Sequence, residues 1–238
     1  MPKWVSIIVD GATVRTPGGA SVLEAALEAG ICIPNLCHVP GVHALGGCRV
    51  CLVEVAAAPG SGKGRMTASC TLEAREGLTV SAHAPDVVRA RRNIVELLLA
   101  EAPNSRAIQD LAVRVGVRAV RYPMRNESCV LCGRCVRICD EVWQSKSLGF
   151  IGRGRDRHVA LPFNTRPDFC KRCHSCIDIC PMTVTPCPGP QKEPAICGLC
   201  ESQCSMAQNT PDTCVWCELG RGFRCVRWQM RGLTADAL

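Results

Sequence analysis

The stretch "CHVPGVHALGGCRVC", residues 37–51, decides the fold of the N-terminal part of this chain. It contains three cysteines, and a fourth at position 70 completes the pattern C-x10-C-x2-C-x18-C. Thiolates are good ligands for iron, and a 2Fe–2S cluster takes two pairs of them. Gly46 and Gly47 allow the loop to wrap tightly, so that backbone N–H groups can point at the sulfurs. The long first gap favours this cluster over zinc. The predicted ligands are Cys37, Cys48, Cys51 and Cys70.

Two further cysteine runs share one spacing. "CVLCGRCVRICD" (129–140) and "CKRCHSCIDICP" (170–181) both read C-x2-C-x2-C-x3-C, which is typical of ferredoxins with two 4Fe–4S clusters. In such ferredoxins the fourth cysteine of each run ligates the other cluster. One predicted ligand set is Cys129, Cys132, Cys135 and Cys180, and the other is Cys139, Cys170, Cys173 and Cys176. Asp140 stands where a proline is usual, which removes no ligand, and His174 is expected to be a solvated loop residue.

The C-terminal part holds a third group of cysteines, whose metal stays open. One interpretation is a third 4Fe–4S cluster, because C-x2-C-x3-C is followed by a distant cysteine. The other is a zinc site with the pattern C-x2-C-x13-C-x2-C. The cluster would use Cys197, Cys200, Cys204 and Cys225, with Cys187, Cys214 and Cys217 as alternative ligands. The zinc site would use Cys197, Cys200, Cys214 and Cys217.

Composition and charge argue against a membrane-spanning protein and against a nucleic-acid-binding protein. The chain has 20 cysteines in 238 residues, lacks an 18-residue apolar run and does not start with the apolar stretch of a signal peptide. We therefore expect a cytoplasmic protein without a membrane span, in which reducing conditions leave thiols free to bind metal. The net charge of +7 offsets clusters that each carry about −2. Because only 4% of residues are aromatic, few platforms exist for stacking bases, and nucleic-acid binding is not expected.

Residue patterns predict an α+β fold with four parts. Residues 1–82 form the 2Fe–2S domain, with strands at "WVSIIV" and "ATVRTP" joined by an Asp10-Gly11 turn. A helix follows in "SVLEAALEAG", where Ser21 and Glu24 form a capping box and Gly30 marks the end. A strand returns in "CRVCLVEV", and "APGSGKGR" reads as an exposed loop. The other parts are a helical linker (83–122), a two-cluster ferredoxin domain (123–186) and a cysteine-rich extension (187–238).

The linker is predicted to contain two amphipathic helices. Asp86 caps the first and Ser105 caps the second, and apolar residues recur at helical spacing after each. The group Arg89, Arg91 and Arg92 is expected on a solvated helix face, with a partner-docking role as the alternative. Cys32 lies outside the metal patterns and is expected to be a buried apolar cysteine.

These motifs, in this order, resemble a known family. The chain is similar to the N-terminal iron–sulfur region of the large complex I subunit and to the diaphorase small subunit of NAD-linked nickel–iron hydrogenases. The matching pieces are "GGCRVCLVEV", "RRNIVELLLAEAP", "CVLCGRCVRICDEV", "LGFIGRGRDRHVALPF" and "CKRCHSCIDICP". The resemblance covers about residues 3–185 and implies a β-grasp 2Fe–2S domain, a helical link and a two-cluster ferredoxin domain.

The resemblance also implies a role. Such subunits carry electrons between an FMN-containing flavoprotein that reacts with NAD(P)H and a catalytic subunit, such as a hydrogenase or a formate dehydrogenase, in a hetero-oligomeric complex. No catalytic residue is predicted, since the chain has no Gly-rich dinucleotide motif. Two alternatives stay open: a reductase whose C-terminal cluster is the substrate site, and a ferredoxin with a zinc-organised docking tail.

The chain departs from the family at one point. The family usually places a His-plus-three-Cys 4Fe–4S site after the "IVELLLAE" helix, whereas this chain has no cysteine between Cys70 and Cys129. We therefore expect that site to be absent, so that electrons pass directly from the 2Fe–2S centre to the ferredoxin pair.

Overall fold

A computed structural model of the chain describes residues 3–56, 64–125, 127–164, 167–168 and 170–182, together with two short strands at 195–196 and 205–206. The chain divides into two compact units. The first comprises Met1–His38 and Ala44–Cys132, and the second comprises Val39–His43 and Gly133–Leu238. Among the described residues, no helix is both long and apolar enough to cross a membrane.

The first unit begins with a hairpin of two strands, β1 (Trp4–Val9) and β2 (Ala12–Pro17). Asp10 and Gly11 connect them with φ angles of 49° and 84°, the combination that two-residue hairpins with a type I′ turn require. Alternate residues of β1 face inward: Val5, Ile7 and Val9 are buried. The predicted hairpin is therefore confirmed.

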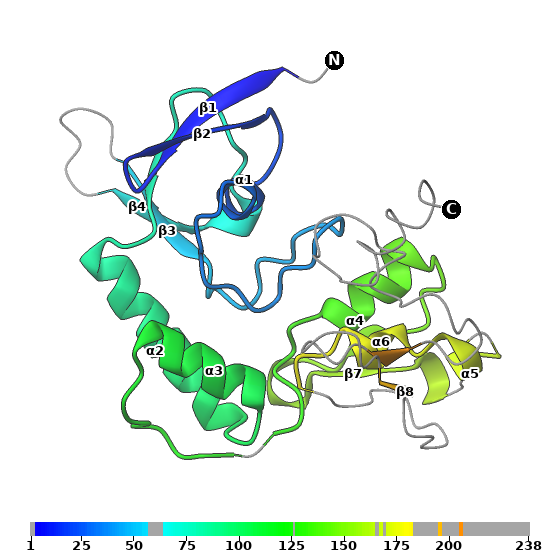
Figure 1. The fold of residues 1–238 in the computed structure, drawn as a ribbon. Coiled ribbons are helices and arrows are strands. Elements are labelled where there is room, and N and C mark those ends of the chain that lie inside the picture. The colour runs from blue at the N-terminus through cyan, green and yellow to red at the C-terminus, as the bar shows by residue number, and fades with distance from the viewer. Residues whose placement is uncertain are drawn as a thin grey trace, which may run out of the picture. The chain divides into compact units, whose positions relative to one another are not determined.

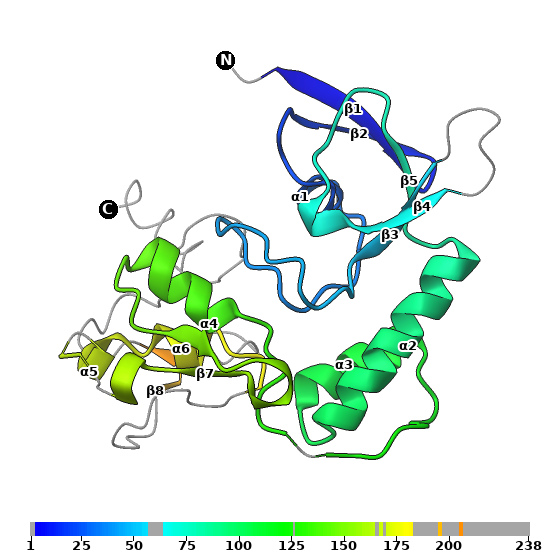
Figure 2. The same cartoon turned by 180° about the vertical axis from the view of Figure 1, so that it is seen from behind.

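Five strands form one mixed sheet in the order β2-β1-β5-β3-β4. The remaining strands are β3 (Leu52–Val55), β4 (Arg65–Ala68) and β5 (Thr79–Ser81), and a short 3-10 turn (Ser69–Thr71) follows β4. β1 and β5 are parallel, whereas the β1–β2, β5–β3 and β3–β4 pairs are antiparallel. The mixed sheet with its helix agrees with the α+β class expected for the N-terminal domain (Figure 2).

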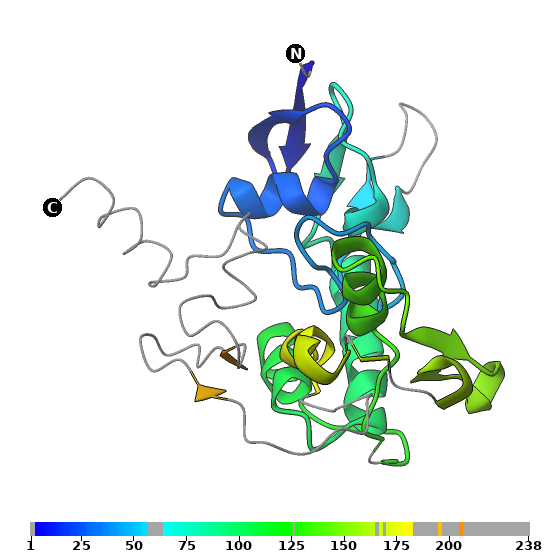
Figure 3. The same ribbon diagram turned by 90° about the vertical axis from the view of Figure 1, so that its right-hand side faces the viewer.

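Helix α1 (Val22–Glu28) packs against this sheet (Figure 3). Its capping box is present: the Ser21 hydroxyl accepts from the Glu24 N–H, and the Glu24 carboxylate accepts from Ser21. Gly30 ends the helix with φ 77°, as the sequence predicts. Val22, Leu23, Ala25 and Ala26 of α1 are buried in the core of the first unit.

Two antiparallel helices complete the first unit, α2 (Pro85–Glu101) and α3 (Arg106–Val115), which lie side by side (Figure 1). Ser105 caps α3 as predicted, accepting from the Ile108 N–H at 3.4 Å. The predicted cap of α2 is wrong: the helix begins at Pro85, with Ala84 in the cap position. Proline suits the first helical position because its φ is already helical and its missing N–H would have no partner there.

The second unit contains short elements around a small core. Its helices are α4 (Arg134–Arg137), a π-helical turn (Ile138–Val142), α5 (Cys170–Cys173) and α6 (Ser175–Asp178). Its strands are β6 (Gly149–Ile151) with β7 (His158–Ala160) and β8 (Ala195–Ile196) with β9 (Ser205–Met206), and 3-10 turns occur at Gly154–Asp156 and Pro162–Asn164. Its buried core is formed by Val39, Val42, Cys135, Ile138, Cys139, Leu148, Leu161 and Ile179.

Candidate metal centres

Four predicted ligands converge in the first unit. The loop after α1 supplies Cys37, the turn before β3 supplies Cys48 and Cys51, and the 3-10 turn after β4 supplies Cys70. Three of these side chains are buried, and that of Cys48 is half-buried. The thiols interact in two pairs, Cys37 with Cys48 and Cys51 with Cys70. This pairing is what the two irons of a 2Fe–2S cluster need.

The thiols strongly affect one another's pKa. Contact with the Cys37 thiol, reinforced by burial, raises the pKa of Cys48. Contact with the Cys51 thiol and burial raise the pKa of Cys70 in the same way. The pKa of Cys51 is lowered to about 6, because the Cys70 side chain and further hydrogen bonds outweigh burial. A lowered pKa favours the Cys51 thiolate, the form that binds metal, at neutral pH.

Backbone N–H groups point at these sulfurs. Cys48 accepts from the N–H groups of Val50 and Cys37, and Cys51 accepts from the Cys70 N–H. The loop reaches this arrangement through Gly46 (φ 64°) and Arg49 (φ 58°), both in the left-handed region. A Cβ at Gly46 would lie 2.9 Å from Cγ2 of Thr71, so the close approach of this loop to the Cys70 turn requires glycine.

Two side chains that were not predicted as site residues hold the backbone of the Cys51 turn. Ser69, which is fully buried, donates to the Cys51 carbonyl from its backbone N–H at 2.9 Å and from its Oγ at 2.8 Å. Arg91 of α2 donates from Nε to the Val50 carbonyl at 3.0 Å and from its terminal nitrogen Nη2 to the Leu52 carbonyl at 2.7 Å. These bonds fix three successive carbonyls around a predicted ligand.

Two sequence expectations about this unit are corrected. Arg91 is only 4% exposed, so the three arginines do not share a solvated face. Arg89 does point to solvent, whereas Arg92 donates to the Val115 carbonyl at 2.9 Å and caps the end of α3. Cys32 is exposed rather than buried, because it lies just after the end of α1 in a loop on the surface.

The region where the sequence lacks the expected additional cysteines forms an amphipathic helix. α3 occupies it, and Ile108, Leu111, Ala112 and Val115 are buried, with α3 packed on α2. Helix–helix packing therefore orders this segment.

The two ferredoxin-type runs are only partly brought together by the described contacts. In the second unit, Cys135 on α4 and Cys139 in the π-helical turn are buried in one core. Both elements pack against α6, which carries Cys176. The remaining cysteines of that unit's runs, Cys170, Cys173 and Cys180, are half-buried.

Cys129 and Cys132 belong to the first unit, where Cys129 is exposed and Cys132 is buried. The Leu131 N–H lies 3.4 Å from the Cys129 sulfur, a backbone donor toward a predicted ligand. His174, predicted to be a loop residue, occupies the position before α6 with φ 51°, and its side chain makes no capping hydrogen bond. The assignment of the eight cysteines to two clusters stays a prediction.

Among the described residues, no group of three or more His, Cys, Asp or Glu side chains is arranged so that it could hold a metal ion. The four thiols of the first unit form pairs instead. The predicted C-terminal ligands, Cys187, Cys197, Cys200, Cys204, Cys214, Cys217 and Cys225, lie outside the described residues.

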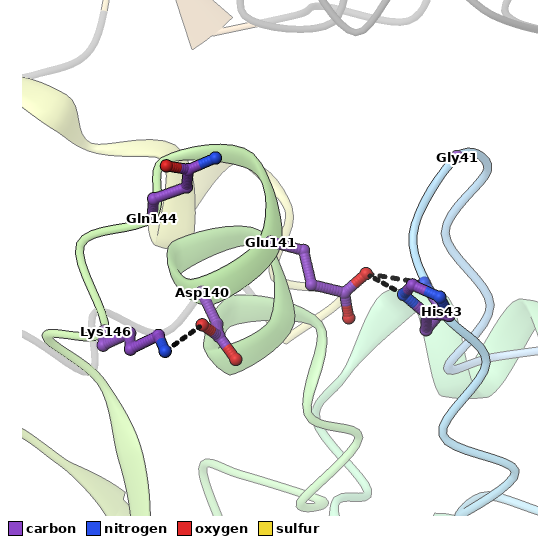
Figure 4. A pocket seen from close by; sticks show the side chains of 6 residues that line it. All are labelled: Gly41, His43, Asp140, Glu141, Gln144 and Lys146. Atoms are coloured by element: carbon purple, nitrogen blue, oxygen red, sulfur yellow. Dashed lines mark hydrogen bonds and ion pairs between the residues drawn. The ribbon is translucent and has the colours of Figure 1, made fainter.

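An open surface groove in the second unit is lined by Gly41, His43, Asp140, Glu141, Gln144 and Lys146 (Figure 4). Oε2 of Glu141 accepts from the His43 N–H at 2.8 Å and contacts His43 Nδ1 at 2.8 Å. Arg137 donates to the His43 carbonyl at 2.6 Å. These contacts hold residues 39–43 against the π-helical turn that carries Cys139, and they therefore stabilise the position of that turn.

The fold and the paired thiols of the first unit define a domain that binds a 2Fe–2S cluster. A family model described as a 2Fe–2S iron–sulfur cluster binding domain matches residues 3–85. A crystal structure of an NAD+-reducing nickel–iron hydrogenase in the hydrogen-reduced state aligns with a TM-score of 0.58 at 31% identity, covering 66% of this chain and 74% of that chain. The chain belongs to the family of iron–sulfur subunits found in complex I and in NAD-linked hydrogenases.

Three relatives illustrate how much of such proteins the chain represents. The NADP-reducing hydrogenase subunit HndD of Solidesulfovibrio fructosivorans is 30% identical over 212 residues, which cover 75% of this chain and 35% of that protein. The HoxS gamma chain of the NAD-reducing hydrogenase of Cupriavidus necator is 28% identical over 207 residues, covering 75% of this chain and 85% of that one. The 75 kDa subunit of the NADH-ubiquinone oxidoreductase of Reclinomonas americana is 30% identical over 207 residues, which cover 75% of this chain and only 28% of that protein.

Proposed function

We propose that the chain is a cytoplasmic electron-transfer subunit, which relays electrons between an FMN-containing NAD(P)H-linked flavoprotein and a catalytic oxidoreductase subunit. The observation that carries this proposal is the pair of thiol pairs at Cys37–Cys48 and Cys51–Cys70, placed in a domain that matches a 2Fe–2S family model. The relatives named as subunits of NAD- and NADP-reducing hydrogenases support the same kind of complex.

The cofactors we propose are one 2Fe–2S and two 4Fe–4S clusters, each able to accept and release an electron. The first would be held by the four paired thiols, and the other two by the eight cysteines of the ferredoxin-type runs. In the C-terminal extension we propose a third 4Fe–4S cluster on Cys197, Cys200, Cys204 and Cys225, with zinc as the alternative.

Helix α2 links the turn that carries Cys51 to the segment just before Cys129, both within the first unit. In its first half, Arg91 binds the backbone around Cys51. At its end, the carbonyls of Ala100 and Glu101 accept from the N–H groups of Arg125 and Glu127 at 2.8 and 2.7 Å, just before Cys129. The helix rises about 15 Å between Arg91 and Glu101. One rigid element thus joins the segments that carry the predicted ligands on either side of the missing family site.

The chain's own residues would bind and shield the 2Fe–2S centre. Burial of Cys37, Cys51 and Cys70 excludes water, and N–H groups directed at the sulfurs stabilise negative charge there. Such a site suits an electron carrier, because ligands held in a fixed arrangement move little when the centre gains an electron.

Reduction in the presence and absence of the partner tests the proposal. The chain is purified anaerobically with and without its co-purifying flavoprotein, and NADH or NADPH is added while the visible absorbance of the clusters is followed. We expect bleaching only when the flavoprotein is present, and full bleaching of both samples by dithionite. Steady turnover of a substrate by the isolated chain, with a dye as electron donor, would show that it has a catalytic site and contradict a pure relay.

A further inference from the structure

Arg91 is a buried charge on a helix that contacts the cluster-binding turn. It is 4% exposed and donates to the carbonyls of Val50 and Leu52, the two residues on either side of Cys51. A guanidinium offers donors in a rigid planar fork, so it can hold both carbonyls at once, whereas an ammonium is a single point of donation. Arg91 therefore fixes the backbone on both sides of Cys51 and with it the direction of the Cys51 side chain.

The surroundings of Arg91 leave its charge poorly compensated. In the described part of the chain it forms no ion pair with a carboxylate, and the acidic groups whose charge acts on it include Cys51 and Asp10. A buried charge without a partner is destabilising, whereas an anionic group nearby offsets that effect. A centre held by four thiolates is such an anion, and it gains one more negative charge when it is reduced.

We propose that the buried positive charge of Arg91 raises the reduction potential of the 2Fe–2S centre. Its positive charge interacts more favourably with the reduced centre than with the oxidised one, since reduction adds one electron and no compensating proton is required. The electron comes from the NAD(P)H-linked flavoprotein, so this inference rests on the proposed function. The hydrogen bonds to Val50 and Leu52 keep the charge at a fixed place beside Cys51.

The chain offers a matched control on the same helix. Arg89 is two residues earlier, its side chain is 74% exposed, and it pairs with Asp86. Its charge is therefore screened by water and by a carboxylate. Arg89→Gln and Arg91→Gln remove the same charge from the same protein, but only the second removes it from beside the cluster-binding turn.

The test is an anaerobic redox titration of the full chain, with the EPR signal of the reduced 2Fe–2S centre as readout. For Arg91→Gln we expect the ratio of reduced to oxidised centre at a fixed potential to fall about tenfold, a shift of about 59 mV to more negative potential. Arg91→Lys keeps the charge and should stay within about threefold of the wild type. Arg89→Gln should leave the ratio unchanged.

Several results would overturn the proposal. Arg91→Gln could hold a full 2Fe–2S centre with an unchanged potential, or Arg89→Gln could shift it equally. If Arg91→Lys shifted the reduction potential as much as Arg91→Gln does, the effect would come from geometry rather than from charge. If Arg91→Gln does not retain the centre, Arg91→Met removes the charge in its place: a tenfold fall in the ratio supports the proposal, and an unchanged potential refutes it. Absence of any 2Fe–2S signal in the wild type would refute the proposed function instead.

Discussion

Replacing Gly46 by alanine should disturb the cluster-binding loop through two separable effects. Gly46 has φ 64°, so any side chain there adopts a conformation that costs about 1–2 kcal/mol. The new Cβ would also lie 2.9 Å from Cγ2 of Thr71, and overpacking of this kind costs typically about 1–3 kcal/mol. Gly77 separates the two effects, since it has φ 74° but no atom lies within 4 Å of the place that a Cβ would take there. Gly77→Ala should therefore show the backbone effect alone.

The assay is the thermal loss of the visible circular dichroism of the 2Fe–2S centre, compared among variants at one heating rate. In a domain of this size about 1 kcal/mol corresponds to about 4–8 °C, so Gly46→Ala should lose its signal at least about 4 °C below Gly77→Ala. Thr71→Ser removes the contacting methyl group and keeps a hydroxyl that can still donate to the Ala68 carbonyl, as Thr71 does at 3.2 Å. The double variant Gly46→Ala, Thr71→Ser should recover most of this difference. Equal midpoints for Gly46→Ala and Gly77→Ala, or no recovery in the double variant, would refute the steric argument.

Three further predictions follow from single residues. Cys70→Ala should abolish the 2Fe–2S EPR signal while the 4Fe–4S absorbance remains, and loss of both signals would contradict separate centres. Burial alone would raise the pKa of Asp10, but hydrogen bonds from His83 and Ser81 outweigh it and lower that pKa. The carboxylate therefore stabilises the fold above the unfolded pKa of about 3.9 and loses this effect as the pH falls through the lower folded pKa. The difference in urea midpoint between the wild type and Asp10→Asn should shrink from pH 7 to pH 3. A difference that stays constant over this range would refute the prediction. Ser105→Ala removes the cap of α3 and should lower the free energy of unfolding by about 1 kcal/mol, measured by urea denaturation. The comparison variant is Asp110→Ala at an exposed position of the same helix, which should change that free energy by less than about 0.5 kcal/mol.

Much of the first unit could be predicted from local patterns. Alternation of apolar residues places Val5, Ile7 and Val9 inside, and the Ser21–Glu24 box starts α1, because both features depend on neighbours in sequence. The spacing groups Cys37, Cys48, Cys51 and Cys70 as one set, whereas their pairing is visible only in the structure. Cys32 and Asp86 were misjudged, since the exposure of a loop thiol and the choice between cap positions two residues apart depend on tertiary surroundings.

The role of Arg91 was missed although a signal for it existed. Arg91 lies four residues after Val87 and four before Val95, on the stripe of α2 that faces the sheet, and both valines are fully buried. Helical periodicity places it inside, whereas its charge suggests the surface. Which carbonyls it binds could not be predicted, because Val50 and Leu52 are about 40 residues away in sequence and meet the helix only in the folded chain.

The most direct test of the central claim is the content of iron, labile sulfide and zinc per chain after anaerobic purification. An electron relay with one 2Fe–2S and two 4Fe–4S clusters predicts about ten irons and ten sulfides. About fourteen irons would add a cluster in the C-terminal extension, and one zinc beside ten irons would make that extension a zinc site. About two irons would contradict the account, because only the 2Fe–2S centre would then remain of the proposed chain of clusters.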